Sequence, residues 1–232
     1  SPVKANETGV KEISGSDENL VAEINNAEDR GSIVVTGDAA INGAIDPTVP
    51  VTFNGDLTVG EDGDIGGDVT VKGTLAMNDG KISGDVVANE VAADATGTVT
   101  GTLTVANPND GELDGLTGTG NAKIVLNKDY IAGADNKFYA DASTDIEEDA
   151  TVPAGTYTWD SSVTAGGGWV ASKVESMTVA VAELNTALAM TNNVTVTGVA
   201  ALTENVTIGE GQTVVFEGLA TTDASKKLTI AQ

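Results

Sequence analysis

A 17-residue period in the middle of the chain is the feature that most constrains its fold. Three consecutive lines of this length begin at Gly67, Gly84 and Gly101. The same class of residue recurs down three columns, which hold Val69, Val86 and Leu103, then Val71, Ala88 and Val105, then Ile82, Val99 and Leu116. A strict short period predicts a repeat architecture, in which each unit buries its apolar face by stacking on its neighbours.

The local pattern within each line indicates strands. Apolar and polar residues alternate at Val69-Thr-Val71 and at Leu103-Thr-Val105, which is the two-residue period of a strand with one face inward. Aromatic residues make up only 3% of the chain, so small β-branched side chains must fill the interior, which suits a narrow core. We therefore predict an all-β fold, a parallel β-helix with ~17 residues per coil. An antiparallel sandwich is the alternative, but it does not require equal spacing over three lines.

A short amphipathic helix is expected ahead of the first coil. Four apolar residues share one helical face, and Ser16 or Asp17 can cap the N-terminus. Gly31 is expected to end the helix, and Ile33 to start the first strand. The apolar face consists of Leu20, Val21, Ile24 and Ala27. Such a helix would cover the open end of the β-helix, where unpaired strand edges invite aggregation.

The beginning of the chain recurs near its end. VAEINNA at residues 21–27 is repeated as VAELNTA at residues 181–187, and Val51–Gly55 is similar to Val214–Gly218. We predict an extended tail at 1–15 that can act as a donor strand, a β-helix module at 16–170, and a second, partial copy of the module start at 171–232. The second copy is short and should be marginally stable alone. Either the sequence is a piece of a longer protein, or contact with a neighbour completes the short copy, and the second alternative is the functional hypothesis. The residues expected to mediate this assembly are Val181, Leu184, Ala187, Leu188, Val194 and Val196.

Composition excludes several classes of function. With 35 acidic and 11 basic residues, the net charge is −24, so nucleic acid is not an expected partner. No apolar run approaches the ~18–20 residues that span a bilayer. The chain has no histidine or cysteine and a single arginine, Arg30, so the usual acid–base, thiol and anion-binding groups are missing. We therefore expect no catalytic activity and no cofactor, apart from a candidate Ca²⁺ site.

The candidate Ca²⁺ ligands lie in one acidic turn. Glu61, Asp62 and Asp64 fall within GEDGDIGGD, and carboxylate oxygens are the ligands that Ca²⁺ prefers. The spacing matches neither an EF-hand loop nor a calcium-binding β-roll. Solvated turn residues are therefore the alternative interpretation.

Three aromatic residues, Tyr157, Trp159 and Trp169, are clustered within 13 residues. They would either cover the last coil or form a platform for glycan binding. The first interpretation follows from the need of a coil end for large apolar cover.

The run GDVVANEVAADATGTVTGTLTV, residues 84–105, resembles the bactofilin family. The resemblance extends over about residues 55–118 and implies a right-handed β-helix that polymerises end to end without nucleotide. The helix caps, the Trp-containing segment and the duplicated module start are more similar to secreted bacterial or archaeal surface proteins with β-helix modules.

These observations predict an extracellular or cell-surface structural protein. We expect it to be the protomer of a filament or surface layer, polymerised with copies of itself through β-helix end stacking, strand addition or both. A monomeric surface adhesin or carbohydrate-binding module, with surface glycans as partners, is the alternative.

Overall fold

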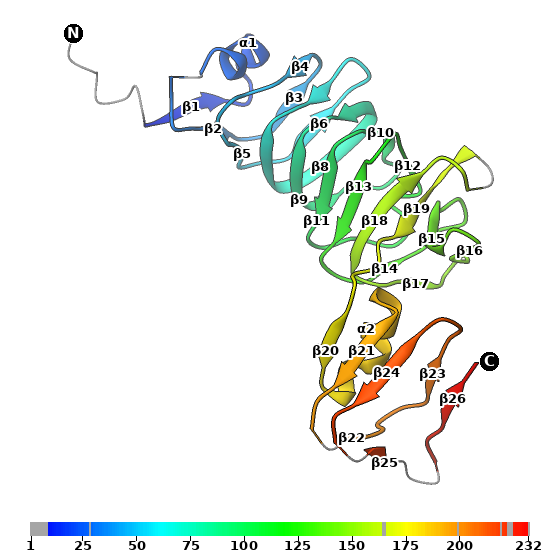
Figure 1. Ribbon diagram of the computed structural model, residues 1–232. Coiled ribbons are helices and arrows are strands. Elements are labelled where there is room, and N and C mark those ends of the chain that lie inside the picture. The colour runs from blue at the N-terminus through cyan, green and yellow to red at the C-terminus, as the bar shows by residue number, and fades with distance from the viewer. Residues whose placement is uncertain are drawn as a thin grey trace. The chain divides into compact units, whose positions relative to one another are not determined.

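The computed structural model describes residues 9–27, 29–163, 166–198, 200–218, 220–221 and 225–231 (Figure 1). The chain divides into two compact units, Ser1–Ala171 (unit 1) and Ser172–Gln232 (unit 2). Each unit is nearly all β, with one short α-helix near its start.

Unit 1 is a β-helix whose coils have three sides. The first full coil consists of β2 (Ser32–Thr36), β3 (Ala39–Ile41) and β4 (Ala44–Ile45). The next consists of β5 (Val51–Phe53), β6 (Leu57–Val59) and β7 (Asp64–Ile65), and each strand pairs in parallel with the one on the same side of the first coil. In the third coil a single strand, β8 (Asp68–Ile82), runs along all three sides and pairs with β5, β6 and β7 in turn. Stacked parallel coils confirm the predicted β-helix.

The 17-residue period is confirmed where the sequence shows it and changes outside that stretch. Val69 lies opposite Val86, and Val86 opposite Leu103. Leu103 then pairs with Ile124, 21 positions further on. The later coils are formed by β9 (Asp85–Val91), β10 (Thr96–Val99), β11 (Thr102–Val105), β12 (Gly115–Gly118) and β13 (Lys123–Leu126).

Counting in steps of 17 residues predicts the wrong strand partner for one residue of the repeat. Leu116 should follow Ile82 and Val99 in one column, but it pairs with Gly97, and Val99 pairs with Gly118. The extra turn between β11 and β12 shifts this side of the coil by two residues. Leu116 is nevertheless buried.

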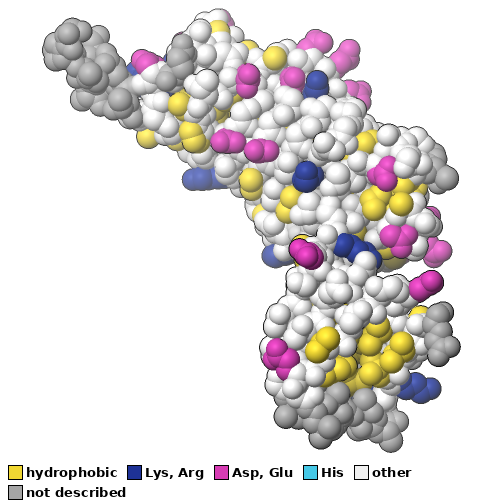
Figure 2. All heavy atoms as spheres, viewed as in Figure 1, with side chains coloured by type: hydrophobic (Ala, Val, Ile, Leu, Met, Phe, Trp, Pro, Cys, Tyr) yellow, Lys and Arg dark blue, Asp and Glu magenta, His cyan; other side chains and the backbone are white. Residues whose placement is uncertain are grey.

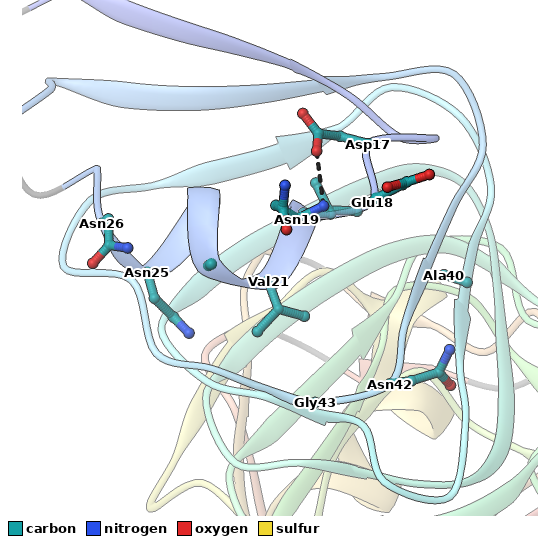
Figure 3. A pocket seen from close by; sticks show the side chains of 11 residues that line it. Asp17, Glu18, Asn19, Val21, Asn25, Asn26, Ala40, Asn42 and Gly43 are labelled. Atoms are coloured by element: carbon teal, nitrogen blue, oxygen red, sulfur yellow. Dashed lines mark hydrogen bonds between the residues drawn. The ribbon is translucent and has the colours of Figure 1, made fainter.

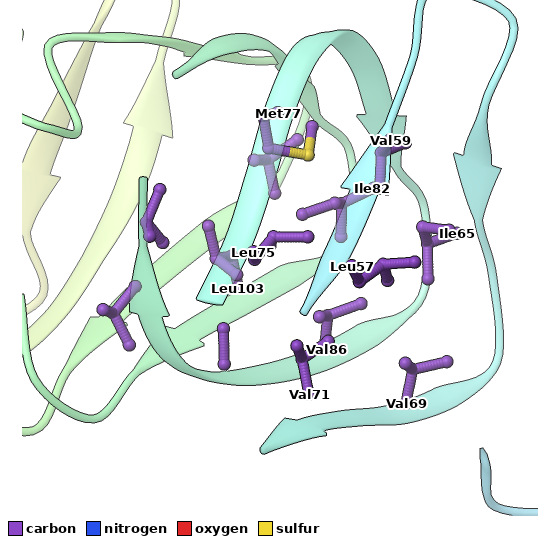
Figure 4. Close-up of a cluster of buried hydrophobic side chains, with 14 of the residues drawn as sticks. Leu57, Val59, Ile65, Val69, Val71, Leu75, Met77, Ile82, Val86 and Leu103 are labelled. Carbon is purple, nitrogen blue, oxygen red and sulfur yellow. The ribbon is translucent and has the colours of Figure 1, made fainter. Parts of the chain in front are cut away.

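The core is a column of aliphatic side chains inside the coils (Figure 4). Val69, Val86 and Leu103 are at most 2% exposed. Val71 and Ala88, which lie on the same face of their strands two residues further along, are also at most 2% exposed. These rows touch one another between coils, so each coil buries the apolar face of the next.

The glycine column is explained by close backbone stacking. A Cβ at Gly84 would lie 2.2 Å from the carbonyl oxygen of Gly67, and one at Gly101 would lie 2.2 Å from that of Gly84. No side chain fits at these corners, which is why glycine recurs with the period.

The regular stacking of parallel coils in unit 1 stops after β13. The strand on top of it, β18 (Gly155–Asp160), runs antiparallel, and β19 (Gly168–Ala171) is antiparallel to β18. The remaining strands of this region are β14 (Tyr130–Ile131), β15 (Phe138–Asp141), β16 (Thr144–Asp145) and β17 (Thr151–Val152). A mixed layer therefore ends the solenoid, since β15 pairs in parallel with β19 and the other strand pairs of this region are antiparallel.

Unit 2 repeats the beginning of unit 1 element by element. In unit 1, β1 (Val10–Ser14) is followed by α1 (Leu20–Asn25) and then β2. In unit 2, β20 (Met177–Val179) is followed by a 3₁₀ turn, η2 (Val181–Glu183), by α2 (Leu184–Met190) and by β21 (Asn193–Val196). The other strands of unit 2 are β22 (Ala200–Ala201), β23 (Val206–Ile208), β24 (Thr213–Phe216), β25 (Ala220–Thr221) and β26 (Leu228–Ile230).

The strand pairings of the two units correspond as well. β20 pairs with β21 as β1 pairs with β2, and β21 pairs with β24 as β2 pairs with β5. β22–β25 and β23–β26 correspond to β3–β6 and β4–β7. All of these pairs are parallel, so the duplicated sequence encodes a duplicated fold.

Candidate functional site

The ends of the two solenoids are the parts of a β-helix where a partner can add coils or strands, so the site is built from them. The N-terminal end of unit 1 is covered by α1, whose Leu20 and Ile24 are buried. Asn25 lies on the outer side and donates from Nδ2 to the carbonyl of Ala44, 3.0 Å away, at the start of β4. The helix is therefore joined to the first coil by apolar packing and by a hydrogen bond.

The second helix uses the repeated residues in the same way. Leu184 is fully buried at the position of Ile24, and Ala187 at that of Ala27. Asn185 donates from Nδ2 to the carbonyl of Asn205, 3.0 Å away, just before β23. The repeated VAE-Ile/Leu-Asn sequence is thus a helix cap that joins the start of a solenoid.

The ends of α1 differ from the expectation. Asn19 occupies the N-cap, and Asp17 accepts a hydrogen bond from the Asn19 N–H at 2.8 Å instead of capping the helix itself. The helix ends at Asn25, well before Gly31, and the N–H of its C-cap residue, Asn26, donates to the carbonyl of Ala22.

A shallow hollow of about 710 Å³ lies beside α1 (Figure 3). Carboxylates of Asp17 and Glu18 and the amides of several asparagines line part of it, and apolar side chains that include Val21 and Ala40 line the rest. This end of unit 1 therefore presents both polar and apolar groups.

The C-terminal end of unit 1 is closed by aromatic rings. Trp169 is fully buried and donates from Nε1 to the carbonyl of Leu116 at 3.0 Å. Its ring lies 5.0 Å from that of Trp159 at 70°, an edge-to-face arrangement that favours packing. A Cβ at Gly118 would lie 2.6 Å from Trp169 Cη2, so the absence of a side chain there admits the ring.

The three aromatic residues considered for glycan contact have no exposed ring face. Tyr157 is 3% exposed, Trp159 7% and Trp169 0%. The Tyr157 hydroxyl donates to the Pro153 carbonyl at 2.6 Å. Sugar stacking needs an accessible ring face, so the geometry corrects the glycan-platform interpretation, and these residues cover the last coil.

The turn that shifts the register of β12 contains a buried carboxyl group. Glu112 is 4% exposed and accepts a hydrogen bond from the Asn109 N–H at 2.8 Å. Burial raises the pKa of Glu112 to about 6, because desolvation disfavours the charged form. Nearby, the Tyr130 hydroxyl donates to Asp114 Oδ1 at 2.8 Å. These contacts stabilise the turn and do not expose a reactive group.

The candidate Ca²⁺ ligands do not converge. Among the residues that the structure describes, no group of three or more carboxylates is placed to hold a metal ion, and this includes Glu61, Asp62 and Asp64. Asp64 instead accepts a hydrogen bond from the Ser83 hydroxyl of the next coil at 2.6 Å. Glu61 and Asp62 are exposed turn residues, and Asp64 is half-buried at the start of β7.

The residues expected to mediate assembly lie inside unit 2. Five of them are buried, and Val181 packs against the same core from a half-buried position. The buried five are Leu184, Ala187, Leu188, Val194 and Val196. The prediction is corrected here, because these side chains build the module and offer no surface to a partner.

The sequence did not predict the partly exposed apolar surface of the last coil of unit 2. In β24, Val214 and Phe216 are half-buried, whereas their counterparts in β5, Val51 and Phe53, are 1% and 0% exposed. The difference arises because β8 covers β5, and no described strand covers β24.

The neighbouring strand β26 shows the same exposure. Leu228 is 36% exposed and Ile230 65%, although the residues with which they pair, Val206 and Ile208, are 3% and 7% exposed. These four side chains (Val214, Phe216, Leu228 and Ile230) form what we call the uncovered end of unit 2. The similarity of Val214–Phe216 to Val51–Phe53 was the sequence signal that could have located it.

The two units also differ in charge. Eight basic and 29 acidic residues give unit 1 a net charge of −21, whereas three basic and six acidic residues give unit 2 a net charge of −3. Figure 2 shows apolar side chains gathered on the visible face of unit 2, with acidic side chains spread over unit 1. Electrostatic repulsion between copies is therefore weakest for unit 2.

In the part of the chain that the structure describes, no helix has the length and apolar character required to cross a bilayer. The strands at both extremities have one unpaired edge in the described residues. Among the described strands, β1 pairs only with β2, and β20 at the start of unit 2 pairs only with β21. In the last coil of unit 2, the strands β24, β25 and β26 each pair only with a described strand of the coil before. Residues 1–8 of the expected donor tail lie outside the described residues, and Val10–Ser14 pairs within unit 1.

Comparison with known proteins gives one match. The family described as "Bactofilin: Polymer-forming cytoskeletal" matches residues 24–109, less than half of the chain. The matched range begins in α1 and ends just after β11, so it covers the regular coils of unit 1 and none of unit 2. No curated protein and no solved structure matches the chain.

The match confirms the resemblance to bactofilins and corrects one prediction. Because the family is described as cytoskeletal, the extracellular or cell-surface localisation expected from the sequence is wrong. Its polymer-forming description supports a self-assembling structural protein. Unit 1 thus contains a β-helix similar to that of a polymer-forming cytoskeletal family.

Proposed function

We propose that this protein is the protomer of a structural polymer, held together by contacts between solenoid ends and by strand addition. The observation that carries the proposal is a stack of parallel coils, matched by a polymer-forming family, in which β1 and the last coil of unit 2 have strand edges that no described strand pairs. Exposed strand edges are templates for pairing with another chain.

Two kinds of contact support growth of such a polymer. The uncovered end of unit 2 offers apolar surface, and the outer edge of β1 offers unpaired backbone groups next to a mainly polar strand. A protomer with a separate contact surface at each extremity propagates, whereas a protomer with one self-complementary surface stops at a pair.

Electron microscopy of the purified chain in negative stain, together with sedimentation velocity over a range of concentrations, tests the proposal. We expect elongated assemblies whose mass increases with concentration. A chain that remains a 23.3 kDa monomer at all concentrations, with no assemblies on the grid, contradicts it.

The contribution of the β1 edge can be tested separately by Glu12→Pro. Glu12 is exposed in β1 and lies opposite Val34 of β2. Proline removes a backbone donor and disfavours strand pairing. We expect shorter assemblies, with Glu12→Ala as the matched control that retains the N–H.

A further inference from the structure

We propose that Asn42 is a modification site, at which the side chain deamidates spontaneously, and that the stacked coils protect Asn54 from the same reaction. Asn42-Gly43 and Asn54-Gly55 are the two Asn-Gly pairs of the chain. Asparagine is among the residues least stable to heat, and a glycine that follows it has no side chain to shield its own backbone nitrogen. Both pairs therefore have the sequence for the reaction, and the structure separates them.

The reaction consumes one water molecule and releases one molecule of ammonia. The backbone nitrogen of Gly43 attacks Cγ of Asn42 and loses its proton. The bond between Cγ and the side-chain nitrogen breaks, that nitrogen leaves with the proton as ammonia, and a five-membered succinimide ring remains. Water then opens the ring at one of its two carbonyls, which yields either aspartate or isoaspartate, the isomer with one additional CH₂ in the main chain.

Ring closure requires the peptide unit between the two residues to rotate until its nitrogen faces the side chain. A peptide unit with open space beside it can rotate, whereas one packed between two coils is held in place. Asn42 and Asn54 are both exposed, so access of water does not distinguish them. The packing of the backbone at each corner does.

The Asn54-Gly55 corner, between β5 and β6, is packed on both sides. A Cβ at Gly55 would lie 2.6 Å from the carbonyl oxygen of Gly37 in the coil before, and one at Gly73 in the coil after would lie 2.7 Å from the carbonyl oxygen of Gly55. The N–H groups of Asn54 and Asp56, on either side of Gly55, each donate a hydrogen bond of 2.9 Å to the coil before. This peptide unit cannot rotate unless the coils separate.

The Asn42-Gly43 corner, between β3 and β4, has the second coil on one side and α1 on the other. A Cβ at Gly43 would meet only the methyl groups of Val21 in α1, at 3.5 and 3.6 Å, which is ordinary van der Waals contact. Within the described part of the chain, the N–H groups of Asn42 and Gly43 have no acceptor. Both residues line the hollow beside α1 (Figure 3), so this peptide unit has space in which to rotate.

Deamidation changes the charge of that hollow. Aspartate or isoaspartate at position 42 adds a carboxylate to a surface that Asp17 and Glu18 already line. The modification therefore increases the negative charge at the end of unit 1 that α1 covers.

Ageing of the folded chain tests the proposal. Arg30 and Lys72 are consecutive trypsin sites, so Asn42 and Asn54 lie in one tryptic peptide, residues 31–72, and are measured together. The chain is kept for days in warm, slightly alkaline buffer and digested, and fragmentation of this peptide in a mass spectrometer gives the deamidated fraction at each position. We expect Asn42 to deamidate several-fold faster than Asn54. Equal rates, a faster reaction at Asn54, or no reaction at Asn42 overturns the proposal.

The chain unfolded in urea is the control for the influence of the fold. Both Asn-Gly pairs are then free of stacking, so we expect them to react at similar rates, and Asn54 to react much faster than in the folded chain. A preference for Asn42 that persists in urea would come from the local sequence and would overturn the proposed protection by the coils.

Gly43→Ala is the matched variant. A methyl group at this position makes only ordinary contact, so we expect the fold to be retained. The methyl group hinders attack by the backbone nitrogen, and deamidation at Asn42 should become several-fold slower while the rate at Asn54 stays the same. An unchanged rate at Asn42 contradicts attack by the Gly43 nitrogen, and a variant that unfolds is recognised by its faster reaction at Asn54.

Discussion

The first coils of unit 1 and the whole of unit 2 have the same order of elements and the same strand pairs. They differ in burial, because the second coil of unit 1 is covered by a third, whereas no described strand covers the corresponding coil of unit 2. Phe53 of β5 is fully buried, whereas Phe216 of β24 is half-buried at the corresponding position. The side chain and the local backbone are alike, so the difference comes from the coil above. In a solenoid, a residue is buried by its neighbouring repeat and not by its own.

The largest expected difference in stability between the units comes from replacing these two phenylalanines with alanine. Phe53→Ala should destabilise unit 1 by about 3–5 kcal/mol, the usual cost of emptying a buried aromatic site. Phe216→Ala should destabilise unit 2 by only about 1 kcal/mol, because part of that side chain is already in water. Both tryptophans lie in unit 1, so their fluorescence follows unfolding of unit 1 in urea, and methyl NMR signals follow unit 2. Equal losses of stability in the two variants would show that Phe216 is as fully buried in solution as Phe53.

The cap helices should respond alike. Ile24→Ala and Leu184→Ala each remove a side chain that is at most 1% exposed between a helix and the first coil. We expect each to destabilise its own unit by about 2–4 kcal/mol, as measured by the same two probes. A clearly smaller loss for Leu184→Ala would mean that the two helices do not have equivalent roles.

The buried carboxyl group provides a difference in pH dependence between the units. The pKa of Glu112 in the folded state, about 6, lies above its ordinary value of 4.5, so the folded state binds the proton more tightly. Glu112 therefore makes its full contribution to the free energy of unfolding of unit 1 below pH 4.5. This contribution, about 2 kcal/mol at most, is lost as the pH rises through about 6.

Urea titrations between pH 4 and pH 7, followed by tryptophan fluorescence, measure this loss. Glu112→Gln is the control, since it keeps the shape and cannot ionise, and it should remove this part of the slope. A slope that remains the same in the variant would assign the pH dependence to other groups.

The smallest expected effect concerns the asparagines of the caps. Asn25 donates to the Ala44 carbonyl and also accepts from the Asp46 N–H at 2.9 Å, whereas Asn185 donates to the Asn205 carbonyl. Asn25→Ala should therefore cost about 1 kcal/mol in unit 1, and Asn185→Ala about 0.5 kcal/mol in unit 2, since exposed hydrogen bonds contribute little. Thermal unfolding of the two variants measures the difference, and a reversed order would contradict the assignment of the bonds.

The sequence predicted the regular coils because their period reflects backbone geometry. Gly84 and Gly101 recur because a Cβ would strike the carbonyl of the coil below. Between them, the buried Val86 and Ala88 lie on either side of the exposed Val87, because successive side chains of a strand point to opposite faces. The helix caps were predictable for a similar reason, since Ile24 and Leu184 lie in the matching seven-residue segments VAEINNA and VAELNTA, each with an apolar face at helical spacing.

The sequence by itself thus determined the solenoid, its capping helices and the duplication of its start, because each depends on spacing along the chain. The tertiary structure decided which side chains are covered. Trp159 and Trp169 could have been a platform, but Gly118 opens the space that buries them. Leu184 and Val196 could have been a contact surface, but they form a core, whereas Phe216 is half-buried and Ile230 is exposed. Burial depends on what stacks against a residue from far along the chain, and spacing alone carries no record of that neighbour.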